Sequence, residues 1–413
     1  MRLVAAALIV CTATARAEPA TLGLADTLRR VADVGPDQAV ARAQLPIAAA
    51  DVRTARMFPN PSLFANAGRA EPIVAGGLTL RLPILGQIGA HVRAAERALE
   101  QTRLEVTLAL WRLRHDARLA YYTAARAGDE LIIARQIETL TRRVAQIAAE
   151  RYDAGAGSLL EKMQAQLVED RALQDVLDRQ AIERVARLEL ARLVGEPGGT
   201  LPPLADALGT VGTTPPIEAL LGDAEREHPE LRALAAERFA AEARAHAARA
   251  DRRPIFNVDL GVELLDPSSC NSGPNADAGP RCVGPRGALS FDLPIFNING
   301  GPIARAEAEA RAAGIKRDAA WLRIAAQVRA AYESFQAATT RSRFFDARYV
   351  PSATQVEAMA REGFAAGRTG LLPLIEAQRS LLDSRLGQTE ARFAVQAARA
   401  DLEEASGVAL SAP

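Results

Sequence analysis

Two stretches of the chain alternate apolar and polar residues with a period of two. In the first, the apolar residues stand at every second position from Phe256 to Leu264, and in the second from Leu289 to Leu293. An earlier stretch, residues 78–82, shows the same alternation. Period two with one apolar side is typical of a strand with unlike faces. We therefore predict β-hairpins at about 62–82 and 255–293. Each run approaches the roughly 9 to 11 residues of a tilted membrane strand, although strands of soluble sandwiches look the same.

Long helices are predicted to follow both hairpins. Residues 89–154 contain no proline, and apolar residues recur at sevens through Leu99, Val106 and Leu113, as in a coiled-coil seam. Such a helix would reach roughly 100 Å. Its counterpart at 300–366 contains Pro351, where we expect a local kink. Four helices of about half this length are predicted at residues 22–56, 158–194, 216–251 and 370–406. Two of them placed end to end would match one long helix.

The predicted elements occur twice in the same order. Pro83 and Pro294 are each followed 38 residues later by a tyrosine, Tyr121 and Tyr332. A repeat of this size predicts one duplicated architecture rather than a row of unrelated domains. The predicted parts are a signal peptide (1–17), a first repeat (18–195), a linker (196–215), a second repeat (216–407) and a short tail (408–413). The proline-rich linker is expected to be a solvated connector.

The first residues resemble an export signal. Arg2 precedes the apolar run Leu3–Val10, and Ala15–Ala17 provides a small-x-small cleavage site. Cys11 lies inside the apolar run without the small residues that precede an acylated cysteine, so we expect no N-terminal lipid anchor. An exported chain with apolar-faced strands raises a problem of closure. Four such strands would leave backbone N–H and C=O groups unpaired at their edges in lipid, so we expect several copies to close one barrel.

Several short motifs support a family assignment. They are Leu293–Asn297, Ala331-Tyr332, Gly363–Leu372 and Ala377–Arg379. With the duplicated order of elements, they resemble the TolC-type outer-membrane efflux protein family, over nearly all of the mature chain. Residues 82–87 are also similar to the CzcC-like metal-efflux branch.

The resemblance implies a mainly α fold with a small membrane β-barrel. The duplicated helix–β-hairpin–long helix–helix repeat would form a trimeric α-barrel and, from three chains of four strands, a 12-stranded β-barrel. It implies an outer-membrane location with a long periplasmic portion. The implied partners are two further copies of the chain (a homotrimer), a periplasmic adaptor (membrane fusion) protein, an inner-membrane pump of the RND type and outer-membrane lipid.

The resemblance also assigns roles to the two turns between helices, Tyr152–Leu160 and Phe364–Leu372. Nearby side chains would meet the adaptor, although a surface turn without a partner is the alternative. The predicted contact residues are Tyr152, Gly155, Gly157, Leu160, Phe364, Gly367, Gly370 and Leu372. Glu161 and Glu376 match positions where family members carry acidic residues that constrict the closed pore. Pro373 departs from that pattern, and two solvated glutamates remain the alternative.

Cys270 and Cys282 lie in one loop, residues 266–285, and are the only cysteines left after signal removal. In an exported protein such a pair is most simply a disulfide, with free thiols or metal ligands as the alternatives.

Charge and motifs exclude several other functions. Fifty basic and fifty acidic residues cancel, so no excess charge indicates nucleic-acid binding. The histidines at 91, 115, 228 and 246 lack metal-ligand spacing, and no catalytic motif occurs. We expect a passive efflux channel with no enzymatic activity, cofactor or metal. The alternative is a soluble periplasmic coiled-coil adaptor or scaffold.

Overall fold

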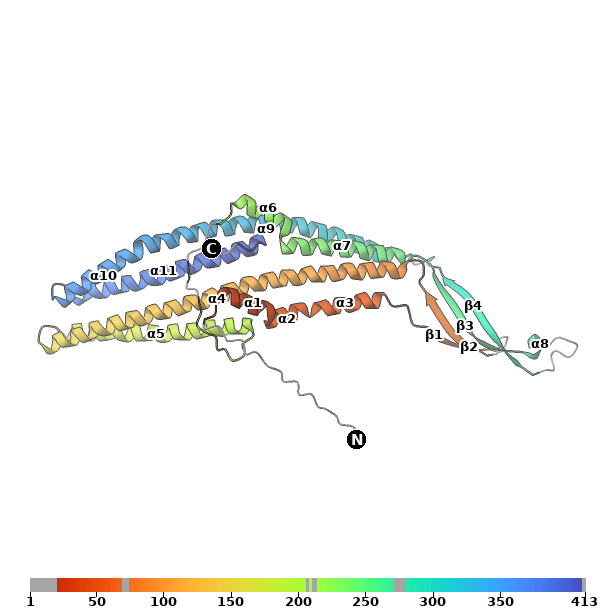
Figure 1. Ribbon diagram of the computed structural model, residues 1–413, viewed down its shortest axis with the longest axis horizontal. Coiled ribbons are helices and arrows are strands. Elements are labelled where there is room, and N and C mark those ends of the chain that lie inside the picture. The colour runs from red at the N-terminus through yellow and green to blue at the C-terminus, as the bar shows by residue number, and fades with distance from the viewer. Residues whose placement is uncertain are drawn as a thin grey trace, which may run out of the picture. The chain divides into compact units, whose positions relative to one another are not determined.

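The computed structural model describes residues 21–68, 74–205, 208–209, 214–270, 280–293, 295–296 and 298–410. These residues are mainly helical, which confirms the predicted dominance of helices (Figure 1). The chain forms two compact units. Unit 1 comprises Met1–Pro36, Asp116–Gly212 and Phe335–Ala400, and unit 2 comprises Asp37–His115, Thr213–Ser334 and Asp401–Pro413.

Unit 2 contains the four-stranded sheet. Its strands are β1 (Ser62–Ala67), β2 (Val74–Leu82), β3 (Ile255–Leu265) and β4 (Cys282–Asp292). They pair antiparallel in the order β1-β2-β3-β4, so the pairing of β2 with β3 joins the hairpins of the two repeats. β1 and β4 are the edge strands. A short helix, α8 (Pro267–Cys270), follows β3.

The strand register gives the sheet two unlike faces. Successive rows of paired residues point to opposite faces. One set of alternate rows contains only apolar residues, glycine and proline, for example the row of Leu63, Leu78 and Leu260. The other set carries every paired polar or charged residue, including Thr79, which donates to Asp259. The period-two pattern of the sequence therefore extends across all four strands.

Gly77 and Gly261 face one another where the two hairpins meet. A β-carbon on Gly77 would lie 2.3 Å from the Leu260 carbonyl oxygen, and one on Gly261 would lie 2.4 Å from that of Gly76. Glycine in a strand often marks such a close approach of two backbones. Any side chain at these two positions would push the hairpins apart.

The helices of unit 2 are α3 (Gln44–Ala55), the first part of α4 (Gln87–Asp153), α6 (Ile217–Glu227), α7 (Pro229–Ala250) and most of α9 (Gly300–Phe344). Small residues let α4 and α7 approach closely, with Ala90 and Ala94 packed against Ala247 and Ala250. Ion pairs join α7 to α9.

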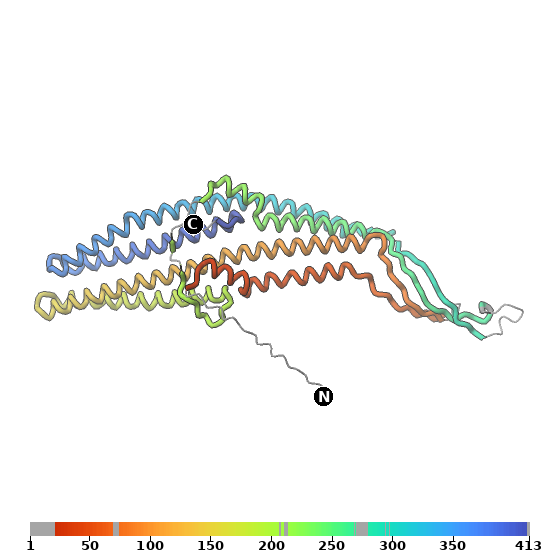
Figure 2. Tube along the Cα trace, in the orientation of Figure 1, coloured from red at the N-terminus to blue at the C-terminus, as the bar shows by residue number. Residues whose placement is uncertain are grey.

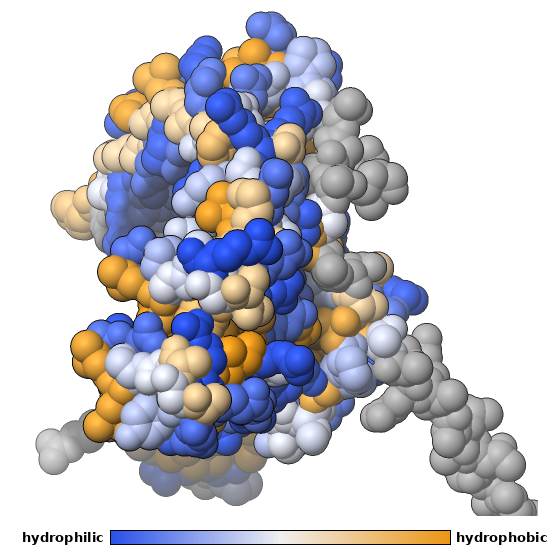
Figure 3. Space-filling model, turned by 90° about the vertical axis from the view of Figure 1, so that its left-hand side faces the viewer, coloured by the Kyte–Doolittle hydropathy of each residue, from blue (hydrophilic) through white to orange (hydrophobic). Residues whose placement is uncertain are grey.

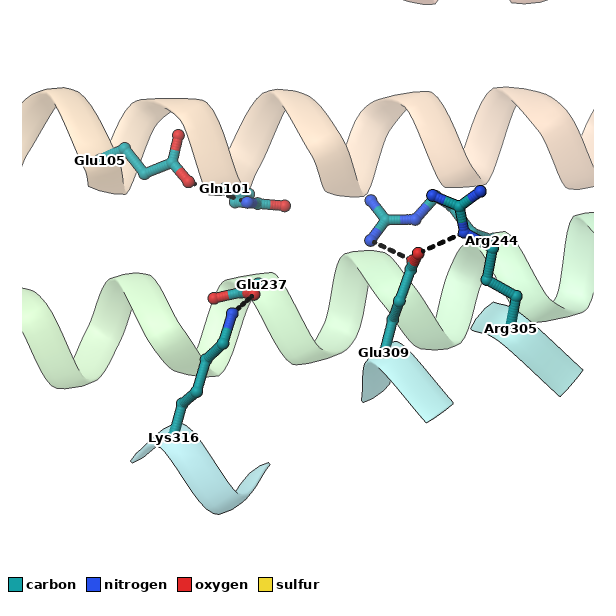
Figure 4. A network of polar contacts seen from close by, with 7 residues as sticks. All are labelled: Gln101, Glu105, Glu237, Arg244, Arg305, Glu309 and Lys316. Atoms are coloured by element: carbon teal, nitrogen blue, oxygen red, sulfur yellow. Dashed lines mark hydrogen bonds and ion pairs between the residues drawn. The ribbon is translucent and has the colours of Figure 1, made fainter. Parts of the chain in front are cut away.

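Figure 4 shows the ion pairs between α7 and α9. Glu309 of α9 accepts from Arg244 of α7 at 3.3 Å and from Arg305 at 2.9 Å. Lys316 donates to Glu237 at 2.8 Å. Because these side chains are substantially exposed, each pair adds little stability by itself.

Unit 1 contains α1 (Leu24–Asp33), the rest of α4, α5 (Leu159–Val194), α10 (Val350–Ala365) and most of α11 (Leu371–Ser406). Arg126 of α4 contacts Glu390 of α11 at 2.7 Å, and Arg179 of α5 contacts Glu130 of α4. These contacts place α4 between α11 and α5, so α5 lies at one side of the helical layer.

Two predicted helices differ in detail. The helix expected over residues 22–56 is divided into α1, α2 (Pro36–Arg42) and α3. Pro36 begins α2, because proline cannot continue a helix but fits its first turn. The second long helix contains one π-helical turn, Phe345–Tyr349, immediately before Pro351. A π-turn next to proline relieves the lost backbone hydrogen bond, and it accounts for the irregularity expected at Pro351.

The linker is more ordered than a solvated connector, which corrects that expectation. Leu201 and Leu208 are buried. The backbone of Leu22 bonds Pro203 and Ala205, each at 2.8 Å, in a parallel bridge. The Tyr121 hydroxyl donates to the carbonyl oxygen of Leu22 at 3.1 Å and also contacts that of Ala205. Burial of the linker leucines favours docking over solvation.

Candidate functional site

The two turns predicted as contact sites both lie in unit 1 and share one backbone geometry (Figure 2). The Gly155 N–H bonds the Tyr152 carbonyl at 2.9 Å, and the Gly367 N–H bonds the Phe364 carbonyl at 3.0 Å. Gly155 and Gly367 have φ of 70° and 67°. This left-handed conformation ends a helix and favours glycine. The left-handed backbone that the sequence predicted at the two glycines is confirmed, and the contact of the turns with an adaptor stays a prediction.

A small apolar core holds the two turns together. Its buried members are Val144, Ala145, Ala148, Ala165, Phe364, Leu371 and Leu374. Phe364 is only 1% exposed. The prediction that it contacts a partner directly is therefore wrong, because its ring fills this core. It can act only by positioning the residues around it.

Arg151 is a turn residue that the sequence reasoning missed. Its guanidinium lies 4.9 Å from the centroid of the Phe364 ring and donates to the Phe364 carbonyl at 3.3 Å. It also donates to the Ala156 carbonyl of its own turn at 3.4 Å. Arg151 thus links the two turns through a cation–π contact and two hydrogen bonds. No local signal in the sequence pairs residues so far apart.

Apolar side chains are exposed beside this core. Leu160 is 65% exposed and Leu372, its counterpart in the second repeat, is 66% exposed. Tyr152 is partly exposed, and Lys162 lies over its ring at 5.0 Å. Figure 3 looks onto this end of the molecule and shows hydrophobic and hydrophilic residues intermixed. Exposed leucines beside a rigid turn are suited to a protein contact. Gly157 and Gly370 complete the two turns, and a β-carbon at Gly370 would meet nothing within 4 Å.

The two candidate pore glutamates lie in different settings. Glu161 belongs to a capping box: its N–H bonds the Ser158 hydroxyl at 3.1 Å, and its carboxylate accepts from the Ser158 N–H at 3.4 Å. The Ser-x-x-Glu sequence could have revealed this role. Glu376 is exposed on α11. Of the two, Glu376 has the carboxylate that is not engaged in starting a helix.

Cys282, at the start of β4, is disulfide-bonded. The side chain of Cys270 lies outside the described part of the structure, so its pairing stays a prediction. The same holds for Cys11 and the signal peptide, since the described residues begin at Thr21.

The described residues offer neither a metal-binding cluster nor a helix suited to cross a membrane. Among them, no three His, Cys, Asp or Glu side chains are grouped so that they could hold a metal ion. None of the described helices combines the length and the apolar character that a membrane crossing requires.

Comparisons with known proteins agree with this geometry. The outer membrane efflux protein family model matches residues 220–408. Protein CyaE of Bordetella pertussis is 29% identical over 383 residues, covering 83% of this chain and 75% of CyaE. The cobalt-zinc-cadmium resistance protein CzcC of Cupriavidus metallidurans is 23% identical over 349 residues, covering 82% of this chain and 80% of CzcC.

The fold also matches solved structures. The outer-membrane channel OprN superposes with a TM-score of 0.73 at 20% identity, over 94% of this chain and 90% of OprN. The resemblance to the TolC-type efflux proteins predicted from the sequence is confirmed, together with the expected outer-membrane location.

Proposed function

We propose that this chain, which resembles the outer-membrane efflux proteins of the TolC type in sequence and in fold, is the exit duct of a tripartite efflux system. The duct conducts substrate passively from an inner-membrane pump and a periplasmic adaptor to the exterior. The observation that carries the proposal is the sheet of unlike faces, with an edge strand at each side. A soluble adaptor would bury such an apolar face against a second layer, whereas Leu63, Leu260 and Leu289 are more than half exposed here.

The open sheet edges support closure by further copies of the chain. β1 and β4 expose unpaired backbone groups that lipid cannot satisfy. Joining the β4 edge of one copy to the β1 edge of the next repeats until the ring closes. Similarity to the family favours three copies. Polar rows, including Arg286 beside Glu263 at 3.5 Å, would then line the interior.

The helices of unit 1 offer a matching side surface. α5 lies at the side of its helical layer, where a solvent-facing helix would be polar. It nevertheless carries exposed apolar residues along its length. Beyond the turn they are Met163, Leu167, Leu173, Leu177, Ile182, Val185 and Leu188. A stripe this long is typical of a protein contact rather than of a solvated helix. A second copy of the chain would cover it.

Cross-linking tests the closed ring. Leu63→Cys on β1 combined with Leu289→Cys on β4 should give dimers and trimers, and no larger species, with a flexible bis-maleimide. Leu78→Cys with Leu289→Cys is the matched control, because Leu78 stands opposite Leu63 on the interior strand β2. Monomers alone, or a ladder beyond three chains, would contradict a closed trimer. Sedimentation with outer membranes and discrete conductance in planar bilayers test the duct itself.

The tip residues are proposed to meet the adaptor. Leu160 and Leu372 are exposed apolar groups at matching positions of the two turns. Charged replacements, Leu160→Asp and Leu372→Asp, should abolish co-purification with a cognate periplasmic adaptor and leave the oligomer intact. Leu322→Asp, at an exposed position of α9 outside both the turns and the α5 stripe, is the control. If adaptor binding survives both tip changes, the turns are not the contact.

Glu376 is proposed as a pore-constricting carboxylate. Glu376→Gln should raise single-channel conductance and reduce cation preference, since a negative charge in a narrow pore attracts cations. Glu161→Gln should change conductance less, because Glu161 is engaged in the capping box. Conductance and selectivity identical to the wild type would remove Glu376 from the gate.

A further inference from the structure

One histidine ring joins two helix ends in unit 2. His228 precedes Pro229, the first residue of α7, and is 5% exposed. Its Nδ1 accepts a hydrogen bond from the Glu230 N–H at 3.2 Å. The ring also hydrogen-bonds the main chain of Glu404, in the last turns of α11. The imidazole therefore bridges the end of α11 and the start of α7.

This bridge needs a neutral ring. Neutral imidazole offers one acceptor and one donor, which suit the Glu230 N–H and the Glu404 carbonyl. A protonated ring has two donors, so the bond from Glu230 would be lost. The positive end of the α7 dipole also opposes a cation at this place. Burial lowers the pKa of His228, which also favours the neutral ring.

The charges around His228 offer little compensation. Glu230 of α7 raises the pKa of His228, but this carboxylate already pairs with Arg323 of α9 at 2.5 Å and Arg112 of α4 at 3.8 Å. Both arginines lower the pKa of His228. On the α11 side, Asp401 and Glu404 line a cavity of about 430 Å³ that His228 also lines. Protons from the solvent can reach the ring through this cavity.

A second histidine holds the same end of α11 in the opposite manner. His115 of α4 contacts the Asp401 carboxylate through Nε2 at 2.8 Å and the Glu404 carboxylate through Nδ1 at 3.4 Å. Both partners are acceptors when ionised, so only the doubly protonated ring can donate to both. Protonation therefore strengthens the link between α4 and α11.

We propose that His115 and His228 form a proton-operated switch, which shifts the end of α11 from its joint with α7 to a clamp on α4 as the pH falls. The switch does not rest on what the duct carries. In the periplasm it would respond to the external medium. Histidine is the side chain that ordinarily changes its charge between about pH 5 and 8.

The first repeat provides an internal comparison. Gly35 precedes Pro36 as His228 precedes Pro229. A β-carbon on Gly35 would lie 2.5 Å from the Val31 carbonyl oxygen and 2.9 Å from that of Leu193. This joint therefore has no room for a ring at the position that matches His228. Acid should therefore loosen the joint of the second repeat alone.

Hydrogen exchange on the full-length protein tests the switch. At about pH 5.0, after correction for intrinsic rates, amides in the first turn of α7 should open about fivefold more than at about pH 7.5, the factor expected for loss of a helix cap. Residues 36–39 should not respond. In His228→Asn, whose amide caps without titrating, the α7 response should vanish. In His115→Asn, the α7 response should remain. On acidification, α11 residues 401–404 should become less protected in this variant, whereas in the wild type they should stay protected.

Two results would overturn the proposal: equal α7 protection at both pH values in the wild type, or the same acid loss in His228→Asn. If the asparagine variant does not fold, the ring signals of ¹³C-labelled histidine decide. They are assigned by subtraction with His91→Asn, His115→Asn and His246→Asn, which leaves the His228 signal. A His228 ring that is still neutral at about pH 5.0 rules the switch out.

Discussion

Gly407 lies against Pro229 where α11 ends and α7 begins, and a β-carbon on Gly407 would come 2.9 Å from Pro229 Cδ. Unit 1 repeats the relationship, since a β-carbon on Gly195, after α5, would come 3.8 Å from Pro36 Cδ. In each repeat a glycine that ends one helix thus meets the proline that starts another. These two joints are where half-length helices meet end to end.

Gly407→Ala should lower the free energy of unfolding by about 1–3 kcal/mol, because φ is 70° and Pro229 and His228 leave no space. Thermal or denaturant unfolding of the purified protein measures this. Gly314→Ala is the control, since this glycine lies inside α9 with nothing within 4 Å of an added β-carbon. It should stabilise by about 1 kcal/mol. Equal effects of the two changes would dismiss the joint as the cause.

Gly77→Ala should weaken the sheet where the two hairpins meet. The added methyl would strike the Leu260 carbonyl, and overpacking of this kind costs about 1–3 kcal/mol. The measurement is the temperature at which the detergent-resistant oligomer dissociates on a gel. Gly287→Ala on β4 should leave that temperature unchanged, because a β-carbon there meets nothing within 4 Å. An unaltered Gly77→Ala oligomer would show that the strands can separate without cost.

Tyr121→Phe should loosen the N-terminal segment and the linker together. The hydroxyl contacts the carbonyl oxygens of Leu22 and Ala205, and its loss removes a buried hydrogen-bond donor, at about 1 kcal/mol. Limited proteolysis should then cut within residues 196–205 sooner than in the wild type. Tyr332→Phe, at the matching position of the second repeat, is the control. Identical digestion of Tyr121→Phe and wild type would refute the role of the hydroxyl.

Asp129→Asn should stabilise the protein at neutral pH. Burial raises the pKa of Asp129, Arg392 opposes the rise and Glu130 adds to it. The folded state therefore binds the proton more tightly than the unfolded chain. Its stability is full below the unfolded pKa and declines as the pH rises through the folded pKa. The variant should exceed the wild type in melting temperature at about pH 7 and not at about pH 3. Asp178→Asn, an exposed carboxylate on α5, should show no such dependence.

The packing of α11 shows how far sequence patterns reach. In α11 the apolar residues Leu371, Ile375 and Leu382 recur at helical spacing, which by itself would suggest one buried stripe. Leu371 is buried, but Leu374 and Leu381 are the fully packed residues further along, while Ile375 and Leu382 line an open groove. The existence of an apolar face was predictable. Its orientation depended on the angles at which α4 and α10 approach, which no local pattern encodes.

The sequence by itself determined the element types, the alternation of the strands and the two glycine turns. Backbone sterics and side-chain period act within a few residues and are written locally. Only the tertiary structure decided that Phe364 is buried, that Arg151 reaches its ring, and that His115 and His228 both hold the end of α11. The contacts of Arg151 with Phe364, of His115 with Asp401 and of His228 with Glu404 each join residues more than 170 positions apart. Their partners were chosen by the way whole helices pack, and helix packing is a property of the assembled chain.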